Sequence, residues 1–244
     1  MGAYVGASAF NYWQETRRPV YSAALVLPFL LTYHIGTLVI GAAYINGADA
    51  LLLRMLSTLS VQGMFASALV LGAVFIYWQV RTKASWRFEL PLILTMFLES
   101  ACYGILLFQF LHWLAPRLSH MAVNSGFTKT EQVVLFCGAG VYEELFFRVI
   151  VMGLLLLVFT KLMHFETAYA AGLAVLASSM LFSLFHYIGP GADVLFDARG
   201  NLIWNGFLQR FFAGVYFAAI FVLRNYGVAA AGHAFYDILT IVKV

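Results

Sequence analysis

Two adjacent carboxylates and a guanidinium interrupt an apolar stretch, GVYEELFFRVIV, at residues 140–151. On a helix, Glu144 and Arg148 are four residues apart and share a face, so we expect them to form an ion pair. Glu143 is turned by about 100° and is not neutralised by that pair. A carboxylate without a counter-ion in a low-dielectric site is suited to act as a general base. The alternative is an acid cluster that only fixes helix packing.

Two further motifs place imidazoles in late apolar runs. FSLFH ends at His186, and GHAFYD contains His233 and Asp237, which are four residues apart and can face one space on a helix. Alone, FSLFH is more typical of an interfacial or hydrogen-bonded histidine than of a catalyst, and GHAFYD is equally compatible with a hydrogen bond that stabilises helix packing. Together, the acids and histidines of three helices can converge on one wet pocket, an inventory that suits hydrolysis by an activated water. His34 and Glu99 are each the single polar group of their kind in an apolar run, and the sequence is equally compatible with a packing role and a functional role for them.

The composition indicates that these groups lie in a membrane protein. Of the 244 residues, 63% are hydrophobic and 10% are charged, against about 25% charged in soluble domains. The net charge of +3 is scattered over short loops, as expected of ordinary membrane flanks. No basic block indicates nucleic acid, so lipid is the expected environment and partner.

Apolar runs separated by polar residues predict an all-α, polytopic bundle of about seven to eight transmembrane helices, because backbone groups in lipid must be satisfied within each segment. The fourth run is either one strongly tilted helix or two shorter helices that meet near Arg148. We expect residues 1–244 to form a single integral membrane domain. The predicted spans are 20–45, 63–80, 90–114, 132–162, 168–188, 206–223 and 227–243.

Segments outside these spans complete the predicted layout. Residues 46–62 are interpreted as an interfacial amphipathic helix, and 189–205 as a surface loop. In a simple up-and-down arrangement, the histidines of the two late motifs fall at different depths, so their meeting requires a tilted or kinked helix.

Loop charge predicts the orientation of the chain. Arg81, Lys83 and Arg87 are placed in the cytoplasm by the positive-inside rule. The N-terminus, with Arg17 and Arg18, is then cytoplasmic too, in a plasma or inner membrane.

The ordered motifs E-E-x-x-x-R, F-x-x-x-H and H-x-x-x-[N/D] resemble the CPBP family of intramembrane proteases, also called the ABI or type II CAAX prenyl protease family. In this chain they read EELFFR, FSLFH and HAFYD, and the likeness covers about residues 130–244 as a catalytic region. The resemblance implies an intramembrane endopeptidase that cleaves membrane-associated protein or peptide substrates. The substrate itself is not indicated.

The resemblance also implies roles for the motif residues. Glu143 is expected to activate water together with His186, whereas His233 and Asp237 polarise the scissile carbonyl or stabilise its oxyanion. Glu144 and Arg148 are expected to hold the motif helix and tune Glu143. Where many relatives carry Asn, this chain has Asp237, whose role is therefore open between a protonated donor and an orienting partner of His233.

The sequence leaves one alternative to a site without a cofactor and two alternatives to a protease. Glu143, His186 and His233 could hold zinc in principle, but nothing in their spacing selects it and a nearby Arg148 opposes a cation, so we expect no cofactor. Buried acids and histidines also form proton relays in transporters, although related halves with interrupted helices are not found. A non-catalytic membrane scaffold or immunity protein is the third class.

Overall fold

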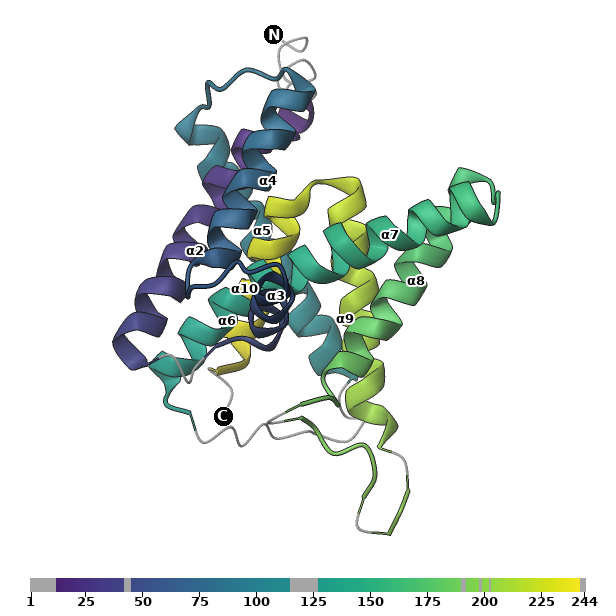
Figure 1. The fold of residues 1–244 in the computed structure, drawn as a ribbon. Coiled ribbons are helices and arrows are strands. Elements are labelled where there is room, and N and C mark those ends of the chain that lie inside the picture. The colour runs from purple at the N-terminus through teal and green to yellow at the C-terminus, as the bar shows by residue number, and fades with distance from the viewer. Residues whose placement is uncertain are drawn as a thin grey trace, which may run out of the picture.

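The computed structural model describes residues 12–41, 45–114, 127–189, 192–197, 199–201 and 203–241. Every predicted apolar run coincides with a helix in this part of the chain (Figure 1). The helices are α2 (Pro19–Ile40), α3 (Gly47–Thr58), α4 (Ala66–Thr82), α5 (Leu90–Leu114), α6 (Lys129–Glu144), α7 (Met152–Leu157), α8 (Thr167–Phe185), α9 (Trp204–Leu223) and α10 (Tyr226–Ile241).

The prediction of a polytopic helical membrane bundle is confirmed. Within the described residues, five helices are long and apolar enough to cross a membrane: α2, α5, the continuous helix Lys129–Leu162, α8 and α9. The apolar helices α4 and α10 are shorter, with 17 and 16 residues. The total number of crossings therefore stays a prediction, and so does the orientation of the chain.

The fourth apolar run is one continuous helix whose geometry changes at the motif. The α-helical hydrogen bonding of α6 gives way to a π-helical segment, η2 (Leu145–Val151), directly after Glu144. A second π-helical segment, η3 (Val158–Leu162), follows α7. Such π-helical insertions are rare and often lie at functional sites. Of the two predicted alternatives, the single long helix is correct, and Arg148 lies within its first π-helical segment.

Helix α10 lies inside the bundle and packs against α5, α6, α2 and α9. Its first half, YGVAAAGHA, is buried, and these small side chains allow neighbouring backbones to approach closely, as in other membrane helix pairs. Gly140 of α6 faces this surface. A Cβ built at Gly140 meets the carbonyl oxygen of Ala230 at 2.5 Å and the backbone nitrogen of Ala234 at 2.7 Å. The α6–α10 crossing thus requires glycine at position 140.

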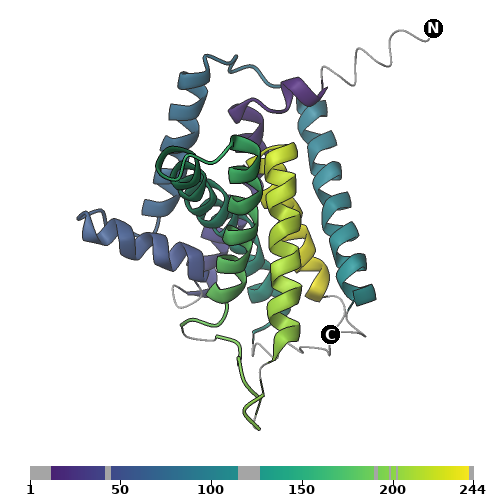
Figure 2. The ribbon, with the colours of Figure 1, turned by 90° about the vertical axis from the view of Figure 1, so that its right-hand side faces the viewer.

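The segment predicted as an interfacial helix forms α3, which packs against α6 and α4 and projects from the side of the bundle (Figure 2). Its helical structure is confirmed, whereas its place at the membrane surface stays a prediction. The first turn is buried, and burial raises the pKa of its carboxyl group, Asp49. The second half of the helix is largely exposed.

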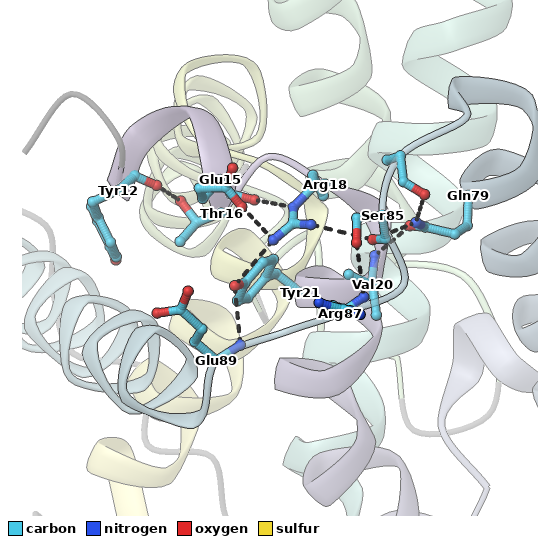
Figure 3. Close-up of polar contacts among 11 residues, drawn as sticks. Tyr12, Glu15, Thr16, Arg18, Val20, Tyr21, Gln79, Ser85, Arg87 and Glu89 are labelled. Carbon is cyan, nitrogen blue, oxygen red and sulfur yellow. Dashed lines mark hydrogen bonds and ion pairs between the residues drawn. The ribbon is translucent and has the colours of Figure 1, made fainter. Parts of the chain in front are cut away.

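Hydrogen bonds fasten the loop between α4 and α5 to the start of α2 (Figure 3). The Arg18 guanidinium donates to the Ser85 carbonyl oxygen at 3.3 Å. The Gln79 side chain accepts a bond from the Val20 backbone N–H at 3.0 Å and donates to the same Ser85 carbonyl at 3.0 Å. Because Gln79 is buried, these bonds satisfy a polar group that lipid cannot solvate.

The same end of the bundle holds an ion pair between a buried arginine and a half-buried glutamate, which the sequence left unassigned. Arg224, in the turn between α9 and α10, donates to Glu99 of α5 at 2.7 Å. The Tyr12 hydroxyl donates to the same carboxylate at 2.6 Å, and the guanidinium lies over the Trp13 ring at 3.9 Å from its centre. Glu99 is therefore a packing partner that joins α5, α10 and the segment before α2.

The close α6–α10 crossing generates a stability prediction. We expect Gly140→Ala to lower the free energy of unfolding by about 1–3 kcal/mol, because the added methyl group meets backbone that cannot move aside. Gly153→Ala is the control, since a Cβ there has no neighbour within 4 Å. Thermal unfolding of both purified variants in detergent measures the difference, and equal melting temperatures would contradict the packing described.

Candidate active site

The three sequence motifs meet at the carboxylate of Glu143. Its Oε2 atom lies 3.9 Å from His186 Nε2, which follows α8, and 4.0 Å from His233 Nε2, on α10. The predicted difference in depth between the two histidines is therefore absent. The chain enters α8 at the far end of the long oblique helix and returns toward α6, whereas α10 is short and carries His233 near its middle (Figures 1 and 2).

Glu144 is enclosed on both of its oxygens. Its Oε2 accepts a bond from Arg148 Nε at 3.1 Å, which confirms the predicted ion pair, and both side chains are fully buried. Its Oε1 lies 2.9 Å from His233 Nδ1. An ionised carboxylate only accepts hydrogen bonds, so Nδ1 of His233 carries the proton and donates it to Glu144. Glu144 thus orients His233. Helical spacing alone does not reveal this contact, because the two residues lie on different helices.

The ring of His233 is also fixed by stacking. It lies on the Phe217 ring of α9, with 4.5 Å between the centres and 13° between the planes. With Nδ1 bound to Glu144, the Nε2 edge faces Glu143 and, at 3.4 Å, Asp237 Oδ2. The expectation that His233 and Asp237 face one space is therefore confirmed, while their chemical roles stay predictions.

His186 is oriented by the backbone of its own helix. Its Nδ1 donates to the Phe182 carbonyl oxygen at 2.9 Å, because a carbonyl oxygen can only accept. The Nε2 atom, on the opposite edge of the ring, is therefore directed toward Glu143. Both imidazoles thus direct their Nε2 atoms toward the same carboxylate oxygen.

The side chains become more exposed in one direction across the site. The exposed fraction is 26% for His186, 19% for Asp237, 9% for Glu143 and 4% for His233. The group is therefore most open on the side of His186 and Asp237. The opposite side is closed by Glu144 and Arg148.

One residue of the site lies outside the motifs. Asn46, directly before α3, donates from Nδ2 to Glu143 Oε1 at 3.0 Å. An Asn-Gly pair before an apolar segment marks a turn or helix start, so the sequence could indicate a cap there. The contact with a residue 97 positions later is visible only in the fold.

The distances between Glu143 Oε2 and the two imidazole nitrogens can be compared with the distances between ligand atoms in a zinc site. Ligand atoms at 2.0–2.1 Å from a tetrahedral zinc ion lie about 3.3 Å apart. Glu143 Oε2 is 3.9 and 4.0 Å from the two imidazole nitrogens, so the side chains would have to contract around such an ion. Among the residues that the structure describes, no group of three His, Cys, Asp or Glu side chains has a metal-binding arrangement.

Residues 130–239 match the family model described as "Type II CAAX prenyl endopeptidase Rce1-like". Neither the curated proteins nor the solved structures contain a match to the chain. The matched region holds both glutamates, Arg148, both histidines and Asp237. Asn46 and the helices α2 to α5 lie outside it.

The enclosed Glu144 carboxylate generates a second stability prediction. We expect Arg148→Met to lower the free energy of unfolding by about 3–5 kcal/mol, because it removes the guanidinium that pairs with a buried carboxylate. Adding Glu144→Gln removes that charge and should recover part of the loss. Thermal unfolding of the single and double variants measures the coupling, with Arg54→Met on the exposed part of α3 as the control. Additive losses would contradict the pairing.

Proposed function

We propose that this integral membrane protein is an endopeptidase, from the premise that residues 130–239 match the Rce1-like family of type II CAAX prenyl endopeptidases. Its substrates are proteins or peptides associated with the membrane. The nucleophile is a water molecule activated by Glu143.

One observation carries this proposal: a single carboxylate oxygen faces two imidazole nitrogens at 3.9 and 4.0 Å. Atoms this far apart are not hydrogen-bonded to each other. A water molecule can nevertheless lie about 2.8 Å from both members of each pair. The geometry therefore suits a water that donates to Glu143 and to one imidazole.

The reaction follows from the orientation of these groups. Glu143 removes a proton from water while the water oxygen forms a bond to the scissile carbonyl carbon, and His186 Nε2 accepts the second hydrogen bond of that water. The tetrahedral intermediate then collapses with cleavage of the C–N bond. Glu143 returns the proton to the leaving nitrogen, so the carboxylate is restored at the end of each cycle.

His233 is proposed to stabilise the oxyanion. It lies between Glu144 at Nδ1 and Asp237 at Nε2, two carboxyl groups that favour its protonated form. A protonated Nε2 can donate to the developing oxyanion, and groups in such a position typically contribute 10²–10³ in rate. In this assignment Asp237 supports the charge of His233 and need not donate a hydrogen bond itself.

We propose further that the water is activated without a metal ion. The support is the separation of the nitrogen and oxygen atoms, which exceeds that of zinc ligands, and the guanidinium of Arg148 bound to the neighbouring Glu144.

Substitution of the base tests the proposed function. In cells that lack the gene, we expect a restored wild-type copy to generate new peptide ends in membrane proteins. Glu143→Gln and His186→Ala should lower their yield about 10²–10⁴-fold, the usual contribution of a general base. Mass spectrometry of protein termini in membrane fractions measures the yield. Glu166→Gln, on an exposed glutamate before α8, is the matched control.

Processing that survives both site substitutions would refute the assignment. A Glu143→Gln variant that retains cleavage but loses flux of a solute across vesicles would instead support a carrier.

Metal removal provides a separate test. We expect cleavage by the purified protein in lipid nanodiscs to persist after prolonged incubation with 1,10-phenanthroline and dialysis, because no step requires a cation. The substrate is a membrane protein identified by its new termini. Loss of cleavage that zinc restores would show that the water is activated by a metal.

A further inference from the structure

Glu143 has two chemically distinct oxygens in this structure. Oε1 accepts a hydrogen bond from Asn46 Nδ2 at 3.0 Å, whereas Oε2 faces His186 and His233 at 3.9 and 4.0 Å. A free carboxyl group turns about its last side-chain torsion, which is broad. The Asn46 bond restricts that rotation and leaves Oε2 directed toward the imidazoles.

We propose that Asn46 is a positioning residue for the base, and that α3 is therefore part of the catalytic apparatus. This inference rests on the proposed function of Glu143. It assigns a role to a segment outside the family match, in which the sequence indicated only an interfacial helix.

The amide of Asn46 is oriented by the start of α3. Its Oδ1 accepts a bond from the Ala48 backbone N–H at 2.9 Å and so caps the helix. Because the oxygen is used by the cap, the NH₂ group must face Glu143. The Asn46 side chain thus caps α3 and holds the base at the same time.

Two further hydrogen bonds fix the backbone at Asn46. Its N–H donates to the Tyr33 hydroxyl of α2 at 3.0 Å, and that hydroxyl donates to Asp49 Oδ2 in the first turn of α3 at 2.8 Å. Both Tyr33 and Asp49 are buried. The position of the amide is therefore fixed by α2 and α3 together, independently of Glu143.

Two substitutions separate the two functions of the Asn46 side chain, which are to cap α3 and to donate a hydrogen bond to Glu143. Asn46→Asp and Asn46→Ser both keep an oxygen that can cap α3, but neither offers an N–H to Glu143. Asn46→Ser removes the donor without adding a charge, whereas Asn46→Asp also places a second carboxylate beside Glu143. Thr128→Ala is the matched control, because it removes the capping box at the start of α6 and leaves the site untouched. Glu143→Gln is measured in the same series.

The first measurement is the infrared spectrum of the protein in lipid nanodiscs. The Glu143 carboxylate band is the one that Glu143→Gln abolishes. We expect this band to shift in Asn46→Ser and Asn46→Asp, since its oxygen has lost a hydrogen-bond donor, and to be unmoved in Thr128→Ala. An unshifted band in the Asn46 variants would overturn the inference.

The second measurement is steady-state cleavage of a membrane protein identified by its new termini. We expect kcat to fall about 10- to 100-fold in Asn46→Ser, the usual effect of a lost hydrogen bond to a charged group, and at least as far in Asn46→Asp, with KM changed much less. Thr128→Ala should retain the wild-type kcat. A shifted band with unchanged kcat would overturn the positioning role, whereas an active Glu143→Gln would overturn the proposed function itself.

Discussion

The structure depends on how two adjacent carboxylates are accommodated inside a lipid-embedded bundle. A charge at mid-bilayer costs about 2.5–3.5 kcal/mol on insertion scales, so each glutamate requires partners within the protein. Glu144 obtains a guanidinium on one oxygen and an imidazole on the other. Glu143 obtains one amide donor and otherwise faces imidazole edges. This difference between the two environments is the basis for proposing Glu143, and not Glu144, as the reactive acid.

This requirement explains much of the architecture. An imidazole can approach Glu144 only if α10 lies against α6, and the glycine and alanine residues at their crossing make that distance possible. Helix α8 supplies the second imidazole, and α9 supplies the ring on which His233 stacks. At the far end of the bundle, the pair of Arg224 with Glu99 fixes the turn from which α10 begins. Helix packing and site geometry are thus parts of one arrangement.

The sequence predicted the helical membrane bundle and the motif residues, because charged groups in apolar runs are conspicuous and helical spacing is regular. It predicted the Glu144–Arg148 pair for the same reason. The bond from Asn46, the stacking on Phe217 and the partner of Glu99 could not be predicted, since each joins residues that are close only after the helices pack. The distance between His186 and His233 was overestimated because straight, upright helices were assumed, whereas the motif helix runs obliquely and changes to π geometry after Glu144.

The central claim is that Glu143 and one of the two imidazoles beside it bind the same water molecule, without a metal ion. An experimental structure of the protein in lipid, with diffraction data on both sides of the zinc absorption edge, tests it most directly. The account predicts a solvent peak about 2.6–3.2 Å from Glu143 Oε2 and from at least one imidazole Nε2, without anomalous signal. An anomalous peak at that position, or side chains too far apart to contact one water, would contradict it.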